Sequence, residues 1–158
     1  MRFDIASASR THETCLPARP AKLDLSGLDI LVVEDNQFIR KLVTHILTAF
    51  GAGSVREASS CAQALDQISL RRPDIIFSDW VMPASGGLDL LRSLRGGRDR
   101  NRAHIPFIVL SGHATNEIVS RALGEGADSY IVKPFSAKTI MMHLLKVIEQ
   151  EDGVCLLD

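Results

Sequence analysis

The chain has 158 residues, 46% of them hydrophobic, which is enough for one domain with a real core but too few for two ordinary domains. Its formal net charge of −1, with 23% charged residues, gives no global indication of binding to nucleic acid or to a membrane surface. The longest apolar stretches have the length of a strand, far below the roughly 20 residues needed to span a bilayer.

The N-terminus carries charges early and lacks the apolar core of a secretory signal, so we expect a cytoplasmic protein. Residues 1–27 mix Ser, Thr, Pro, Arg and Ala without a sustained period, which predicts a flexible extension. The three cysteines, Cys15, Cys61 and Cys155, have no metal-like spacing, and we expect reduced thiols without a functional role.

Ordered structure is predicted to begin at residues 29–33, a β-branched run without alternation, as is typical of a parallel strand buried on both faces. In residues 38–50 the apolar side chains recur at intervals of three and four, and Gly51 follows where a glycine commonly ends a helix. A short strand at residues 54–58 and a helix at about 60–70 complete this half of the chain.

Pro73 ends the second helix and precedes a third strand at residues 74–78, which places Asp79 at its end. The remaining predicted elements alternate between helix and strand, with Ser136 as the N-cap of the last helix; they are 88–95, 107–110, 117–123, 129–132 and a helix that continues through Ile148. The pattern predicts an α/β fold, a doubly wound five-stranded parallel sheet of (βα)5 type with the flavodoxin-like order 2-1-3-4-5, in residues 28–150. Residues 151–158 are expected to form a C-terminal tail.

Three acidic residues, Glu34, Asp35 and Asp79, follow apolar strands. Because the carboxyl ends of parallel strands meet in one crevice, these carboxylates can converge and bind a hard cation such as Mg²⁺. Two further strand ends supply the hydroxyl of Ser111 and the cation of Lys133. Together the five groups suggest an aspartate that accepts a phosphoryl group.

Residues 28–150 resemble a response-regulator receiver domain, similar to the stand-alone chemotaxis type. The resemblance depends on four motifs in order along the chain: Val33-Glu34-Asp35, Ser78 to Pro83, Leu110-Ser111-Gly112, and Tyr130 to Phe135. It implies that Asp79 is the nucleophile and receives a phosphoryl group from a histidine kinase or a histidine phosphotransfer protein.

The resemblance also assigns roles to the other residues of the site. Asp35, Asp79 and the backbone carbonyl of Val81 would bind Mg²⁺ directly, and Glu34 would act through a coordinated water. Lys133 would contact the phosphoryl oxygens, with a cis peptide bond before Pro134. Ser111 would hydrogen-bond the phosphoryl group, and Tyr130 would turn inward in response. The alternative for Tyr130 is an ordinary half-buried strand residue.

Several residues depart from the commonest family pattern. The acidic pair is Glu-Asp rather than Asp-Asp, and Ser111 replaces a more frequent threonine. Val81 and His113 occupy the two positions that influence how fast the acyl phosphate hydrolyses. An apolar Val81 cannot orient an attacking water, so we hypothesise a longer phosphoryl lifetime. We interpret His113 as a loop residue at the rim of the pocket rather than as a relay phosphohistidine.

Basic residues gather near the end of the third predicted helix, and we expect a solvated loop there, with an acidic partner surface as the alternative. These residues are Arg92, Arg95, Arg98, Arg100 and Arg102. Neither end of the chain offers room for a DNA-binding domain, so we expect signalling by docking to a downstream protein through the fourth helix, fifth strand and fifth helix.

The main alternative is an enzyme, a phosphatase or phosphotransferase with an aspartyl-phosphate intermediate. Enzymes of that kind carry a second acid two residues after the nucleophile, where this chain has Val81. We therefore expect self-phosphorylation and self-dephosphorylation only. The sequence does not separate a terminal effector from an intermediate in a phosphorelay, because both need the same five groups.

Overall fold

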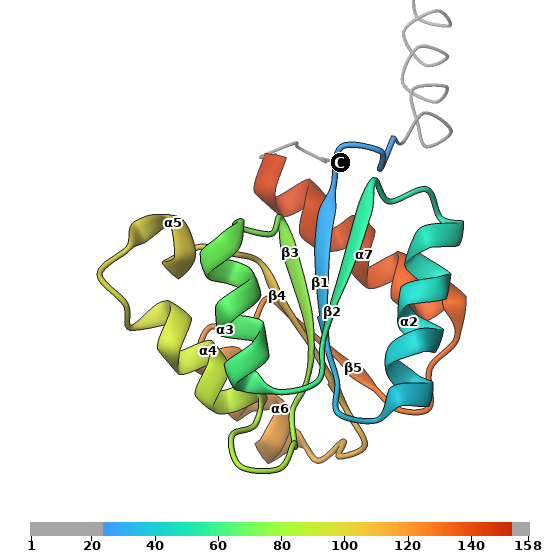
Figure 1. The fold of residues 1–158 in the computed structure, drawn as a ribbon. Coiled ribbons are helices and arrows are strands. Elements are labelled where there is room, and N and C mark those ends of the chain that lie inside the picture. Colours follow the sequence, from blue (N-terminus) through green and yellow to red (C-terminus); the bar gives the residue numbers. More distant parts are fainter. Residues whose placement is uncertain (1–23, 153–158) are drawn as a thin grey trace, which may run out of the picture.

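The computed structural model describes residues 24–152, which form a single parallel sheet surrounded by helices (Figure 1). The strands are β1 (Asp29–Val33), β2 (Ser54–Ala58), β3 (Ile75–Asp79), β4 (Phe107–Ser111) and β5 (Ser129–Val132). The helices are α2 (Gln37–Ala49), α3 (Cys61–Leu70), α4 (Gly87–Arg95), α5 (Arg100–Ala103), α6 (Asn116–Gly124) and α7 (Ala137–Asp152).

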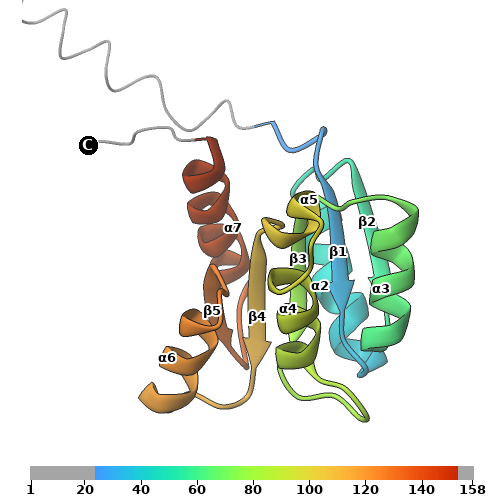
Figure 2. The same cartoon turned by 90° about the vertical axis from the view of Figure 1, so that its left-hand side faces the viewer.

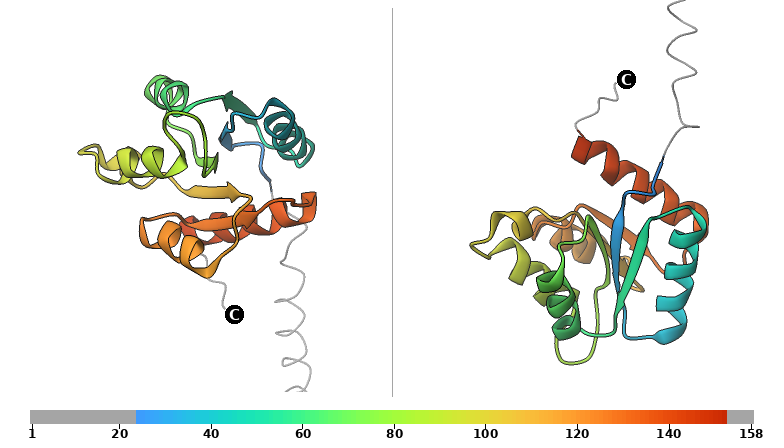
Figure 3. Two further views of the ribbon diagram at one scale, coloured as in Figure 1. Left: turned by 90° about the horizontal axis from the view of Figure 1, so that it is seen from below. Right: turned by 45° about the horizontal axis from the view of Figure 1, so that its top comes forward.

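The strand order is β2-β1-β3-β4-β5 and every pair is parallel, so the predicted fold class is confirmed. The register aligns the carboxyl ends of neighbouring strands. Val33 lies opposite Ser78, Asp79 opposite Leu110, and Ser111 opposite Val132. The polar residues at the ends of β1, β3, β4 and β5 therefore share one edge of the sheet, which the left view of Figure 3 shows from below.

Two hydrophobic layers cover the faces of the sheet. One contains Leu31 and Val33 from β1 and packs against α3, α4 and α6, while the other contains Ile30 and Val32 and packs against α2 and α7. Figure 2 shows this arrangement of helices on the two sides. Because the strand is buried on both faces, its apolar run does not alternate with polar residues.

The helix ends follow the sequence signals. The side chain of Asn36 accepts hydrogen bonds from the N–H groups of Phe38 and Ile39 at the start of α2. Gly51 has a φ of 99°, the left-handed conformation that favours glycine after a helix. Ser136 accepts the N–H of Thr139 at 3.1 Å, as predicted for the N-cap of the last helix.

The arginine-rich segment differs from the prediction. It contains a short helix, α5, and the guanidinium of Arg95 donates hydrogen bonds to the backbone carbonyls of Ala103, Ile105 and Gly126 and to the carboxylate of Asp128. The expectation of a solvated loop was therefore wrong for Arg95. Its acceptors lie 8 to 33 residues further along the chain, so no local pattern reveals them.

The described residues extend slightly beyond the predicted domain limits. Leu25 is buried in the core, and α7 continues to Asp152, two residues past the expected end at 150. Cys61 is buried, whereas Cys15, Cys155 and most of the predicted terminal extensions lie outside the described residues. Among the helices of residues 24–152, none has the length and apolar character needed to cross a membrane.

Candidate functional site

Three carboxylates converge at the carboxyl edge of the sheet. Glu34 and Asp35 follow β1, Asp79 ends β3, and one oxygen of each lies within 4.8 Å of the others. Glu34 and Asp79 are buried, with 1% and 6% of their surface exposed, and Asp35 is open to solvent. The fold therefore brings together the three acidic residues that were predicted to converge at the strand ends.

Lys133 reaches the same cluster from the end of β5. Its Nζ donates to Oε2 of Glu34 at 2.8 Å and to Oδ1 of Asp79 at 3.2 Å. Burial alone would lower the pKa of Lys133, but the hydrogen bond to Glu34 and the charge of Asp79 outweigh it and raise the pKa, which keeps the ammonium charged. The peptide bond between Lys133 and Pro134 is cis, as the family resemblance implied.

Glu34 is the most perturbed acid of the cluster. Burial raises its pKa to about 7, and the charge of Asp79 acts in the same direction, against the hydrogen bonds from Lys133 and from the N–H of Asn36. One ammonium thus pairs with two of the three carboxylates, and all three offer only oxygen ligands. A set of this composition, buried at Glu34 and Asp79 and open at Asp35, fits a hard divalent cation, which would favour the ionised form of Glu34.

Ser111 and Tyr130 are joined through the loop after β4. The buried Oγ of Ser111 accepts the N–H of His113 at 3.1 Å, and the hydroxyl of Tyr130 donates to the carbonyl of His113 at 2.7 Å. Tyr130 is 9% exposed and belongs to the core layer under α3, α4 and α6. The Tyr130 ring is therefore largely buried in this structure, and its movement on phosphorylation stays a prediction.

The loop after Asp79 returns closely onto the strand. The N–H of Gly87 donates to the carbonyl of Trp80 at 3.0 Å, and a Cβ at position 87 would lie 2.3 Å from the carbonyl oxygen of Asp79. Only glycine fits there, a requirement that the sequence alone did not reveal. Val81 lies in this loop with its side chain 59% exposed.

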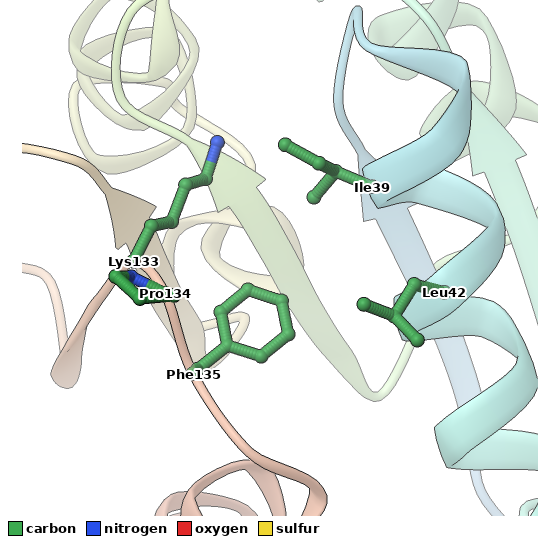
Figure 4. Close-up of a pocket in the computed structure, with 5 residues that line it drawn as sticks. All are labelled: Ile39, Leu42, Lys133, Pro134 and Phe135. Atoms are coloured by element: carbon green, nitrogen blue, oxygen red, sulfur yellow. The ribbon is translucent and has the colours of Figure 1, made fainter.

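An apolar groove of about 310 Å³ adjoins the site (Figure 4). Ile39 and Leu42 of α2 form one wall, and Lys133, Pro134 and Phe135 form the other. Lys133 therefore belongs both to the groove and to the carboxylate cluster. We did not predict the groove, because it joins residues nearly a hundred positions apart in the chain.

Comparisons with known proteins agree with this geometry. A family model described as the response regulator receiver domain matches residues 30–145. The chain is 32% identical over 124 residues to the chemotaxis protein CheY-3 of Vibrio cholerae, which covers 78% of this chain and 94% of that protein.

Solved structures show the same fold. Chemotaxis protein CheY4 of Vibrio cholerae superposes with a TM-score of 0.71 at 28% identity, covering 76% of this chain and 98% of that chain. The receiver domain of NtrX from Brucella abortus gives a TM-score of 0.69 at 33% identity, covering 77% and 98%. Because the family model extends from β1 into α7, the chain belongs to the response-regulator receiver domains, the CheY-like proteins of two-component signalling.

Proposed function

We propose that the protein accepts a phosphoryl group on Asp79 from a histidine kinase or a histidine phosphotransfer protein, and that it signals by a changed affinity for a partner. The observation that carries this proposal is the position of Lys133, whose ammonium bonds the buried Asp79 beside two further carboxylates. An aspartate with a purely structural role at a strand end needs neither a buried ammonium nor two further carboxylates beside it.

In the proposed reaction a carboxylate oxygen of Asp79 attacks phosphorus while the bond between the phosphorus and the donor's imidazole nitrogen breaks. The product is an acyl phosphate on Asp79, and the histidine leaves with the electron pair. Lys133 holds a positive charge against the phosphoryl oxygens. The hydroxyl of Ser111, now an acceptor for the N–H of His113, would donate its own proton to a phosphoryl oxygen.

We further propose Mg²⁺ as the cofactor. Asp35, Asp79 and the carbonyl of Val81 would bind the ion, and Glu34 would act through a coordinated water. The all-oxygen donor set and the raised pKa of Glu34 support this assignment. When bound, the ion would neutralise charge on the phosphoryl group as it is transferred. His113 and Val81 would influence the lifetime of the product.

The proposed partners use two different surfaces. Three exposed apolar side chains, Leu123 of α6, Val132 of β5 and Met142 of α7, support a downstream protein on the α6–β5–α7 face. The phosphodonor must bring its histidine to Asp79, and the groove beside Lys133 is the adjacent apolar surface that such a donor would cover.

The test is incubation with Mg²⁺ and acetyl phosphate. The wild type should gain one phosphoryl group per chain, stable to acid and labile to base, and Asp79→Asn should gain none. Mass spectrometry measures the label. Sustained release of phosphate from many monoesters would instead favour the phosphatase alternative, and a wild type that never acquires the label would end the proposal.

A further inference from the structure

Arg40, in the first half of α2, connects the acidic pair to the neighbouring strand. Its Nη1 donates to the backbone carbonyl of Glu34 at 2.8 Å, and its Nε donates to Oε1 of Glu57 at 2.9 Å. Glu57 lies near the end of β2 and also pairs with Lys41 at 3.0 Å. The Arg40 side chain is 15% exposed, so most of the guanidinium is withdrawn from solvent.

The backbone of Glu34 is held by two hydrogen bonds, one to strand β2 and one to Arg40, which is itself paired with Glu57 of β2. The N–H of Glu34 donates to the carbonyl of Ala58 at 3.0 Å, and its carbonyl accepts from Arg40. The Glu34 carbonyl and the Asp35 N–H belong to the same planar peptide unit, so Arg40 also sets the direction in which Asp35 leaves the strand. Among residues 24–152, the Asp35 carboxylate has no hydrogen-bonding partner, and its position therefore depends on this backbone.

We propose that Arg40 is a positioning residue that holds the Glu34–Asp35 peptide so that both carboxylates face Asp79, with Glu57 as its anchor. The inference rests on the proposed function, in which this pair binds the cation used for phosphoryl transfer. A partly exposed ion pair such as Arg40–Glu57 contributes little to stability by itself. The hydrogen bond to the Glu34 carbonyl gives Arg40 its effect on the site.

Arg56 of β2 offers a matched control, because its contacts lie at the amino end of β1 rather than at the carboxyl end. It too bonds a carboxylate, Asp29 at 2.8 Å, and a backbone carbonyl, that of Gln67 at 2.9 Å, and its side chain is 16% exposed. Asp29 begins β1, whereas Glu34 follows its end. Loss of Arg56 should therefore disturb the fold in a similar way without reaching the acidic cluster.

The experiment measures Mg²⁺ affinity directly. Trp80, the only tryptophan of the chain, follows Asp79, so its fluorescence can report binding, and calorimetry provides a second readout. Arg40→Gln should weaken Mg²⁺ binding by about tenfold, the lower end of the effect of residues that orient metal ligands. Arg56→Gln should leave the dissociation constant unchanged. Urea unfolding of both variants compares their stabilities.

Three further variants separate geometry from charge. Glu57→Gln keeps an acceptor for Arg40 and should retain the wild-type affinity within about twofold, whereas Glu57→Leu should weaken it like Arg40→Gln. Arg40→Lys, which keeps the charge and most of the packing, provides a folded variant if Arg40→Gln does not fold, and it should also bind Mg²⁺ more weakly.

Wild-type binding together with unchanged affinity in Arg40→Gln, or in Arg40→Lys if the first variant is unfolded, would overturn the inference and leave the proposed function intact. A wild type that binds no Mg²⁺ would overturn both.

Discussion

Val81 lies two residues after the proposed phosphoacceptor, with an isopropyl side chain that is 59% exposed. It can neither donate nor accept a hydrogen bond, so it cannot hold the water that would hydrolyse an acyl phosphate. Val81→Asn adds an amide at the same place, and we expect the phosphorylated protein to lose its label faster, by about tenfold if one positioned water is worth about 1.4 kcal/mol.

The measurement is the decay of radiolabelled phosphoprotein after removal of the donor. Val81→Ala is the control, because it shortens the side chain without adding a polar group, and its decay should match the wild type. Equal lifetimes for Val81→Asn and the wild type would contradict the hypothesis.

The sequence was most informative about residues at strand ends. Glu34, Asp79 and Lys133 could be placed together because parallel strands bring their carboxyl ends to one edge, whatever their separation along the chain. Arg40 and Arg95 could not be recognised, since each acts on the fold through backbone carbonyls, which carry no mark in the sequence. The orientation of Tyr130 likewise depends on the carbonyl of His113, which only the folded loop provides.

A side-chain hydrogen bond between His143 and Ser129 joins helix α7 to strand β5. Burial lowers the pKa of His143 below its usual 6.5, and the nearby Lys146 lowers it further. The unfolded chain therefore takes up a proton at a higher pH than the folded protein does. The contribution of His143 to stability should fall as the pH drops below about 6.5 and through the lowered value of the folded state.

This pH dependence can be checked by urea unfolding between pH 7.5 and pH 5, on the order of one unit to either side of the usual histidine value. Glu34, whose pKa is raised to about 7, titrates in the same range with the opposite sign, so the readout is the difference in unfolding free energy between the wild type and His143→Gln. This difference should shrink toward pH 5, whereas the difference between the wild type and His45→Gln, a substitution of an exposed residue of α2, should stay constant. A difference between the wild type and His143→Gln that grows toward pH 5 would show that the sign is wrong.

Arg95 joins α4 to the segments that lead into β4 and β5. Arg95→Ala would leave the partly buried carbonyls of Ala103, Ile105 and Gly126 without this donor, and an acceptor left without a partner costs at most about 1–3 kcal/mol when it is fully buried. We expect a loss of about 3 kcal/mol in the free energy of unfolding, measured in urea. Arg98→Ala, in the exposed part of the same segment, should change it by less than about 0.5 kcal/mol.

Element types were predictable because most strands are short unbroken apolar runs, and the long helices have a clear apolar period and an end signal. The short helix α5 was missed, since its four residues are too few to show a period. Its N-cap, Asp99, accepts the N–H of Asn101 at 2.9 Å, which is a signal that a polar loop can equally contain.

For the whole molecule, the proposed donor surface and the proposed output surface can be tested separately. Phe38 is 87% exposed on α2, the helix that also supplies Ile39 and Leu42 to the groove, and Met142 is 57% exposed on α7. Phe38→Ser should slow transfer from a histidine phosphotransfer protein by about tenfold, the effect of losing one apolar anchor. Transfer from acetyl phosphate should not change, because this donor is too small to contact Phe38.

Met142→Ser is the matched control, and both donors should phosphorylate it at the wild-type rate. Rapid-quench measurement of phosphoprotein formation gives the rates. If Phe38→Ser is equally fast with the protein donor, the donor does not contact Phe38 on the exposed face of α2, whereas slowing with acetyl phosphate would point to damage at the acceptor itself.

The close contact of Gly87 with the backbone of Asp79 also limits where a conformational change can start. On that side α4 begins directly against the end of β3, where even a Cβ at position 87 would clash, so a shift of the acceptor strand toward α4 meets backbone at once. On the other side the residues from Gly112 to Thr115 are exposed, and a Cβ at Gly112 would meet nothing within 4 Å. A displacement triggered at position 79 therefore has one low-cost direction, away from α4 and toward α6, so α6 should be the first helix to move.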